Sequence, residues 1–177
     1  MGDSTAYARA RCLCELLEER DEEVGLFAEL RTVVELQAVA RYDYVNRRTG
    51  PDGEDVWFDL DVTTADDDTL KPHLPLDLME DVPGGSVEDR FVGVLGRGTA
   101  AVDWHALWPD DPESDRPPSA KYDGVQVVFH GEEAQWDRWS EHHTVFVHVS
   151  KFGDLSRARK LAAHIGGEAL GEPQIGW

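Results

Sequence analysis

Two apolar stretches in the C-terminal half carry most of the information about the fold. Gly124–His130 reads Gly-Val-Gln-Val-Val-Phe-His, and His143–Ser150 reads His-Thr-Val-Phe-Val-His-Val-Ser. Both are short and rich in β-branched and aromatic residues, which predicts two strands. A short helix is predicted between them at 132–140. A longer helix is predicted at 155–165, where apolar residues recur at helical spacing, Asp154 can cap the first turn and Gly166-Gly167 can end the last.

The N-terminal region has the spacing of an amphipathic helix. The pattern covers residues 5–19, with Asp3 or Ser4 as N-cap, and its apolar positions are Tyr7, Ala10, Leu13, Cys14 and Leu17. An acidic run at 18–23 interrupts it. The spacing then resumes at Val24, Phe27 and Leu30, which predicts a second short helix or a bent continuation of the first.

Alternation with a period of two predicts a β-hairpin over residues 34–62. Apolar side chains stand at every second position from Val34 to Tyr44, and again from Val56 to Val62. The segment between them, 47–54, is dense in turn formers. Because leucine, glutamine and alanine favour helices, a helix over 32–40 remains the alternative.

The middle of the chain is less regular. Residues 63–89 are predicted to be a long polar loop with a helical turn near Leu76–Asp81, and residues 91–95 a short strand whose hairpin partner is Ala100–Trp108. Residues 109–118 form an acidic, proline-rich loop, and the tail 168–177 is predicted to add an edge strand. We therefore expect one α+β domain, 1–177, with helices packed on one face of a mostly antiparallel sheet. The candidate internal boundary is 109–121.

The composition is strongly acidic. The 177 residues include 36 Asp and Glu against 17 Lys and Arg, a formal net charge of −19. This balance argues against nucleic acid or anionic lipid as partner, because both need clustered cations. The chain has no apolar run of about 20 residues and no signal-peptide pattern. Its two cysteines, Cys12 and Cys14, indicate neither a disulfide nor a zinc site, so we expect a cytoplasmic protein.

The outward face of the predicted hairpin is the first candidate site. If Val56, Phe58 and the residues in phase with them face the core, the opposite face carries Asp55, Trp57, Asp59 and Asp61, with Glu35 and Asp43 on the partner strand. Like charges facing one another destabilise a sheet, and an exposed tryptophan among carboxylates suits a basic partner. A merely solvated acidic face is the plain alternative. Asp59 and Asp61 could also bind Mg²⁺ or Ca²⁺.

A histidine-rich segment is the second candidate site. If strands 124–130 and 143–150 are antiparallel neighbours, His130 can approach His142 or His143, and nearby glutamates could complete a zinc site. His143 and His148 cannot share a metal, because they lie on opposite faces of a regular strand. The His-Glu-x-x-His spacing of zinc hydrolases is not present. Surface histidines without a ligand are the alternative.

A local excess of cations is the third feature. Lys151, Arg157, Arg159 and Lys160 lie around the start of the last predicted helix, and they could hold an anion such as phosphate or pair with carboxylates of the same chain. No glycine-rich phosphate loop precedes them, so we expect the intramolecular pairing. The Gly-x-Ser-x-Gly motif of a nucleophilic hydrolase is also missing.

These observations favour an interaction protein without a cofactor. Its function would be to bind, and thereby neutralise, a basic protein such as a nuclease or another toxin, as an inhibitor or immunity-like protein. The carboxylate excess supports this hypothesis, since it accelerates association with a basic partner. One alternative is a small metal-assisted hydrolase that uses the histidine and carboxylate residues. The other is a domain adapted to a salt-rich or GC-rich source, whose charge has no partner.

Overall fold

The computed structural model of the chain describes residues 3–20, 22–41, 47–49, 52–57, 61–85, 87–114, 116–136 and 138–176. Within these ranges the strands are β1 (Glu19–Arg20), β2 (Glu23–Leu30), β3 (Arg47–Thr49), β4 (Asp55–Trp57), β5 (Leu76–Pro83), β6 (Ala100–Leu107), β7 (Gly124–Phe129) and β8 (Thr144–His148). The helices are α1 (Asp3–Cys14), α2 (Val33–Ala40), α3 (Asp67–Leu70), α4 (Val87–Val92) and α5 (Leu155–His164), with a 3₁₀ turn, η1, at Lys71–His73.

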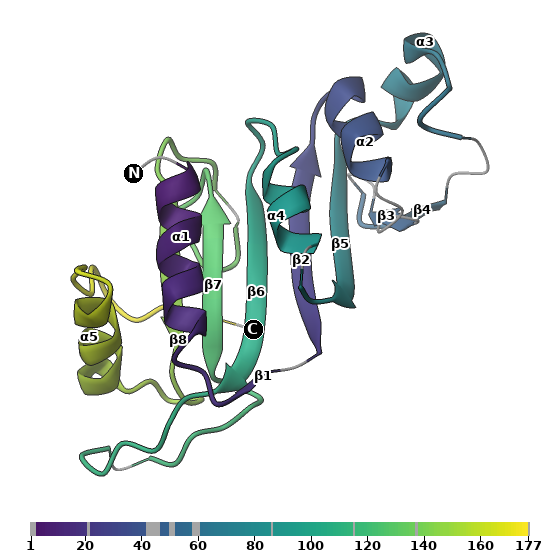
Figure 1. Cartoon of the computed structure of the whole chain (residues 1–177). Helices are drawn as coiled ribbons and strands as arrows, with labels where there is room; N and C mark the ends of the chain where they lie inside the picture. The colour runs from purple at the N-terminus through teal and green to yellow at the C-terminus, as the bar shows by residue number, and fades with distance from the viewer. Residues whose placement is uncertain are drawn as a thin grey trace.

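The described strands form a single antiparallel sheet. Its order is β4-β3-β5-β2-β6-β7-β8, and the short β1 pairs with β6. Figure 1 shows the helices on one side of the sheet, with α1 beside β7 and α4 between β6 and β2. The predicted α+β fold, a mostly antiparallel sheet with helices packed on one face, is confirmed.

The two faces of the sheet differ in character because side chains alternate along each strand. On the helix side, Leu26, Val102 and Val127 belong to the main hydrophobic core, and α1 adds Ala10 and Leu13. Burial of such side chains contributes roughly 25 cal/mol per Å² of apolar surface, which makes this layer the main source of stability. The opposite face carries a smaller core of Phe27, Ala101 and Val128, against which Trp136 and Phe146 pack.

The second predicted helix is wrong, because residues 23–30 form β2. This strand lies between β5 and β6 in the middle of the sheet. Apolar residues therefore occupy both of its faces, Leu26 on the helix side and Phe27 on the other. A strand buried on both faces does not show clean alternation, and the three-residue spacing of Val24, Phe27 and Leu30 therefore resembles a helical stripe.

The first strand of the predicted hairpin is also wrong, and the helical alternative is confirmed as α2. A capping box begins this helix: Glu35 N donates to Thr32 Oγ1 at 3.2 Å, and Thr32 N donates to Glu35 Oε2 at 2.9 Å. The hairpin that the structure describes is shorter and pairs β3 with β4. In its register Arg47 lies opposite Trp57, so Glu35 is not on the partner strand.

Two further elements, between residues 76 and 95, differ from the sequence prediction. The segment predicted to contain a helical turn is β5, whose core-facing Leu76 and Leu78 alternate with Asp77 and Met79. The strand predicted at 91–95 is wrong, because Val87–Val92 form α4. The strand predicted at 100–108 is confirmed as β6, but its partners are β2 and β7.

The C-terminal half follows the sequence prediction more closely. Strands β7 and β8 and helix α5 are confirmed, and the Oδ1 atom of Asp154 accepts the amide of Arg157 at 3.0 Å as the predicted N-cap. The helix predicted at 132–140 is wrong. In that segment the described residues form turns and one isolated bridge, between Gly131 and Trp139. Residues 168–176 contain no strand, so the predicted edge strand is wrong as well.

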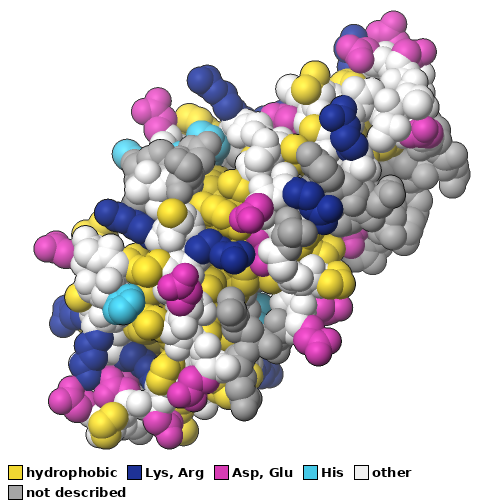
Figure 2. Space-filling model, in the orientation of Figure 1, with side chains coloured by type: hydrophobic (Ala, Val, Ile, Leu, Met, Phe, Trp, Pro, Cys, Tyr) yellow, Lys and Arg dark blue, Asp and Glu magenta, His cyan; other side chains and the backbone are white. Residues whose placement is uncertain are grey.

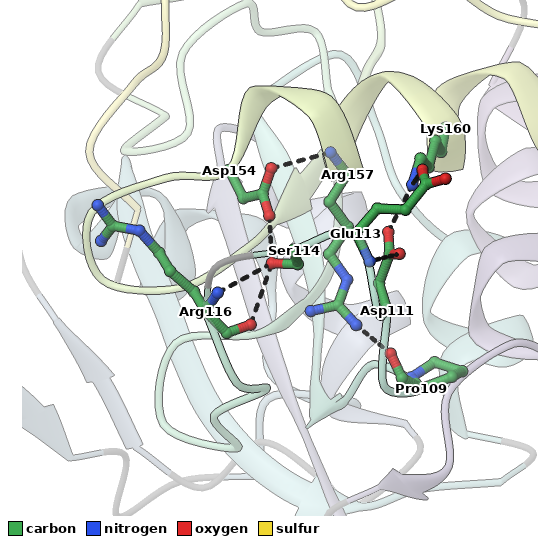
Figure 3. A network of polar contacts seen from close by, with 8 residues as sticks. All are labelled: Pro109, Asp111, Glu113, Ser114, Arg116, Asp154, Arg157 and Lys160. Carbon is green, nitrogen blue, oxygen red and sulfur yellow. Dashed lines mark hydrogen bonds and ion pairs between the residues drawn. The ribbon is translucent and has the colours of Figure 1, made fainter.

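The acidic, proline-rich loop joins β6 to β7, which are neighbours in the sheet. Polar contacts hold it against α5, as Figure 3 shows. The Ser114 hydroxyl donates to Asp154 Oδ2 at 2.6 Å, and the Arg157 guanidinium donates to the carbonyl oxygen of Pro109. The carboxylate of Asp154 therefore caps α5 and anchors the loop at the same time.

Candidate functional site

A hollow of about 210 Å³ opens on the face of the sheet opposite the helices. Its floor is one row across four strands, in which Asp81, Gly25, Asp103 and Gln126 are register partners in turn. Register partners point to the same face, so the side chains of this row meet in the hollow. We call it the Asp103 hollow, and its remaining lining includes Phe27, Met79, His105, Gln135 and Trp136.

A glycine makes room at the centre of this row. A Cβ atom on Gly25 would lie 3.5 Å from Asp103 Oδ2 and 3.5 Å from Asp81 Oδ1. The two carboxylates thus flank the position that any other side chain would occupy. Glycine inside a strand weakens pairing and often marks a place where another group approaches the backbone.

Asp103 is the most unusual group in the hollow. It is 8% exposed, and its Oδ1 atom is buried without a hydrogen-bond partner among the described residues. Burial raises the pKa of Asp103 to about 7, Asp81 adds to the rise, and the side chain of Gln126 opposes it. A carboxyl group that titrates near neutral pH beside a second carboxylate can exchange a proton or accept a cationic donor.

Gln126 and its contacts form the deep side of the hollow. The Nε2 atom of this buried side chain donates to the Ala134 carbonyl oxygen at 3.0 Å, and its Oε1 lies 3.3 Å from His148 Nε2. Burial, followed by the neighbouring His105, lowers the pKa of His148 to about 3. The ring is therefore neutral at physiological pH and adds no positive charge beside Asp103.

Aromatic side chains form one wall of the Asp103 hollow. Trp136 stacks on Phe27 with ring centroids 4.6 Å apart, and together with Ala101, Val128 and Phe146 they form a small second core on this face. The C-terminal tail supports the loop that carries Trp136, because the amide of Ala134 donates to Gln174 Oε1 at 2.9 Å. This packing fixes one wall of the hollow.

A second hollow of about 440 Å³ continues from the first along β2 and β5. The two share Phe27, Met79 and Trp136. Together they form a surface that we call the acidic groove. Its lining includes the carboxylates Glu29, Asp77, Glu80, Asp81 and Asp103, the cation Arg31, and the aromatic and thioether groups of Phe27, Met79, Trp136 and Trp139.

The groove carries negative charge that the described part of the chain leaves largely uncompensated. Glu29 pairs with Arg31 at 2.7 Å, whereas Asp77, Asp81 and Asp103 have no ion pair with a described lysine or arginine. Burial and then Glu29 raise the pKa of Asp77, which is the effect expected of crowded carboxylates. On the helix side, Figure 2 shows Lys and Arg side chains interspersed with Asp and Glu.

The hairpin residues predicted to bind a partner lie elsewhere. Asp43 and Asp59 are outside the described residues, and Asp55 and Trp57 are described only as backbone of β4. Asp61 lies beyond that strand, where its Oδ1 accepts the amide of Thr63 at 2.9 Å and the hydroxyl of the same residue at 2.6 Å. Its carboxylate is therefore part of a local turn.

The histidines predicted as weak metal candidates are only partly brought together. The rings of His130 and His143 lie 4.7 Å apart, and the backbone amide of His130 donates to His143 Nδ1 at 3.1 Å. His142 is exposed and lies 3.6 Å from Glu132. Among the residues with described positions, no group of three or more His, Cys, Asp or Glu side chains is arranged to hold a metal ion.

Two of the four cations around α5, Arg157 and Lys160, make polar contacts within the chain. The Nζ atom of Lys160 donates to Asp111 Oδ2 at 2.8 Å and to Glu113 Oε2 at 2.7 Å, which Figure 3 shows beside the Arg157 contact. The predicted intramolecular pairing is confirmed for Lys160. Exposed pairs of this kind contribute little individually, but they orient the loop.

Sequence reasoning missed Asp81, Asp103 and His105. A signal for the last two was present, because Asp103 and His105 alternate with Val102 and Trp104 inside an otherwise apolar strand. A carboxylate in such a strand is a reason to look for a site. The approach of Asp81 could not be read from the sequence, since it depends on the register of β5 against β2.

Comparisons of this chain with protein-family models, curated proteins and solved structures give no match. No helix in the described ranges has the length and apolar character needed to cross a bilayer.

Proposed function

We propose that the protein is an interaction protein that binds a basic protein partner, and neutralises it by binding, with the acidic groove as its binding surface. The observation that carries this proposal is that carboxylates without a described lysine or arginine as ion-pair partner lie on the same face as accessible apolar groups. Asp77, Asp81 and Asp103 lie beside Met79 and Trp136 along two adjoining hollows.

The apolar groups give the groove anchoring points. Met79 is 54% exposed and Trp139 is 44% exposed, and both line the same hollow. Interfaces are enriched in tryptophan, methionine and arginine, and a few such residues carry most of the binding energy. Trp139 is also held in place, because its indole donates to the carbonyl oxygen of Arg97 at 2.8 Å.

The carboxylates supply steering and specificity. A net charge of −19 accelerates encounter with a basic protein, and the unpaired groups in the groove direct that encounter to one face. The hairpin residues Asp55 and Trp57 remain a second predicted contact, on a strand two positions from β5 in the sheet order. We place the protein in the cytoplasm, where thiols such as those of Cys12 and Cys14, which form no disulfide, stay reduced.

The proposal is tested with matched charge reversals. One variant carries Asp77→Lys and Asp81→Lys in the groove, and the control carries Glu15→Lys and Asp110→Lys, two exposed acids outside it. Each immobilised protein is exposed to lysate of the source organism at 0.15 M salt. The Debye length at this concentration is about 8 Å, so weak long-range attraction between surface charges is screened. Any retained protein is identified, purified and titrated against the wild type, the groove variant and the control variant.

Wild type and control should retain a protein with a basic isoelectric point, and the groove variant should bind it at least tenfold more weakly. Circular dichroism melts of the three chains establish that each is folded. Equal affinity of all three chains, or no basic protein retained by wild type, would contradict the proposal. A third variant, Trp57→Ala, reports whether the hairpin contributes.

A further inference from the structure

The Asp103 hollow contains an acceptor, Asp103 Oδ1, that no described residue of the chain satisfies. Of the described buried side-chain atoms, Asp103 Oδ1 and His130 Nδ1 are without a hydrogen-bond partner, and Asp103 is the one that lines a hollow. A buried carboxylate oxygen without a donor is costly, and proteins normally supply a partner. The position thus indicates a donor that comes from outside the chain.

The neighbouring groups favour a donor with positive charge. Asp81 stands across Gly25 from Asp103, and no described cation pairs with either carboxylate. A neutral donor would satisfy one oxygen but would leave two negative groups in proximity. A cation between them relieves both problems.

The shape of the hollow favours a planar organic cation. Its two carboxylates present several acceptor positions from opposite sides, which matches the fork of a guanidinium better than the point charge of an ammonium. The Trp136 ring, fixed by its stacking on Phe27 at 4.6 Å, offers an aromatic surface at the wall. Arginine stacks favourably on such a surface, and its methylene stem can lie against Met79.

We propose that the Asp103 hollow receives the guanidinium group of an arginine side chain of the partner, with Asp81 and Asp103 as its carboxylate acceptors. This inference rests on the proposed function, since the arginine belongs to the basic partner. Gly25 is the residue that leaves the space, and Trp136 is the residue that selects a planar group.

Binding of a cation in the hollow depends on pH in a defined direction. The groups that face Asp103 are Asp81 on β5, His105 on its own strand, Gln126 on β7 and His148 on β8. Because the unoccupied Asp103 carboxyl is half-protonated near pH 7, raising the pH from 6 to 8 ionises most of it. Affinity for a guanidinium should therefore increase by about tenfold over this range.

The test uses three small probes and the full chain. The probes are Nα-acetyl-arginine amide, its uncharged citrulline analogue and Nα-acetyl-lysine amide, each titrated into ¹⁵N-labelled protein at pH 8. The arginine probe should shift the amide signals of residues 25, 81 and 103. The lysine probe should bind at least fivefold more weakly, and the citrulline probe should cause no saturable shift.

Variants then assign the binding to the named residues. Asp103→Asn should lower the affinity for the arginine probe at least tenfold and remove the pH dependence of that affinity. Gly25→Ala should also lower the affinity, because its methyl group fills the space. Asp110→Asn, an exposed control, should leave it unchanged. Equal binding of arginine and citrulline probes, or equal binding by wild type and Asp103→Asn, would overturn the inference, as would saturation of the hollow by Mg²⁺ or Zn²⁺ in place of the arginine probe.

The partner experiment separates this inference from the proposed function. If the Asp77→Lys, Asp81→Lys variant loses a basic partner that Asp103→Asn and Gly25→Ala bind as tightly as wild type, the groove binds the partner but no arginine enters the hollow. If no basic protein is retained while the arginine probe binds with the expected dependence on Asp103, the guanidinium site stands and the protein-binding function does not.

Discussion

Gly25 lies directly opposite Asp103 in the pairing of β2 with β6, and a Cβ atom on Gly25 would approach the Cβ of Asp103 to 3.3 Å. This separation is tighter than most contacts between side chains, so even alanine would require a small displacement of Asp103. A central strand gains nothing from glycine in stability. The pairing of a side-chain-free position with a buried carboxylate is instead what gives the hollow its space and its charge.

Asp103→Asn should stabilise the protein at high pH. Because the folded-state pKa of about 7 lies above the unfolded value of 3.8, the stability of wild type falls as the pH rises through this interval. The substitution removes the cost of ionising a buried group, and the free energy of unfolding at pH 8 should increase by on the order of 2 kcal/mol. Urea unfolding at pH 5 and pH 8 measures this change.

His148 changes the stability of the protein with pH in the opposite direction to Asp103. The effect of Asp103 is therefore measured as the difference in the free energy of unfolding between the variant and the wild type at each pH. The folded-state pKa of His148 is lowered to about 3, so the stability it contributes is lost as the pH falls below about 6.5. Asp110→Asn provides the matched control. An Asp103→Asn variant whose stability differs from wild type by the same amount at both pH values would show that Asp103 is not the titrating group.

Glu88→Ala should be among the most destabilising single substitutions on the helix side. Glu88 is 3% exposed, and it accepts Trp104 Nε1 at 3.3 Å and the amide of Gly85 at 2.9 Å. Alanine leaves both donors, and the Arg11 guanidinium 3.5 Å from Glu88 Oε1, without this acceptor, at an expected cost of about 3 kcal/mol. Glu88→Gln retains an acceptor and should lose less than half as much, as measured by tryptophan fluorescence in urea. Equal losses in the two variants would contradict this account of the hydrogen bonds.

The Ser114 and Asp154 side chains should be energetically coupled. Asp154→Ala removes the N-cap of α5 and should cost about 1–2 kcal/mol, and Ser114→Ala should cost about 1 kcal/mol. Since one carboxylate serves both contacts, the double variant should cost less than the sum. Cap formation also lowers the pKa of Asp154, so its contribution is present at neutral pH and is lost as the pH falls through the folded-state value. Additive losses would show that the loop and the helix are independent.

The sequence predicted elements best where local chemistry and tertiary position agree. Helix α5 has a strong cap at Asp154, an apolar stripe and a glycine end, and its prediction holds almost to the residue. The Thr32 and Glu35 capping box was an equally local signal for α2, and it would have decided between strand and helix. The period-two alternation of 34–44 predicts a strand all the same, because the residues before Arg41 suit both structures.

The acidic groove could not be derived in the same way. The charges of Asp77 and Asp81 are visible in the sequence. The strand that carries them is predicted as a loop, because its run of alternating apolar residues is short and has proline at both ends. The meeting of Asp81 with Asp103 depends on β2 inserting between β5 and β6. Such an order is set by long-range packing, which no local pattern in one sequence encodes.

Added salt should raise the melting temperature. With 36 acidic and 17 basic side chains, the folded chain repels itself, and screening shortens from about 10 Å at 0.1 M to about 3 Å at 1 M salt. The repulsion should be concentrated where carboxylates crowd, as at Asp77, whose pKa is raised by burial and by Glu29. Asp77→Asn should therefore reduce the salt dependence more than Asp110→Asn. Thermal melts in KCl at the two concentrations provide the measurement, and a wild-type melting temperature that stays flat or falls would show that self-repulsion does not limit stability.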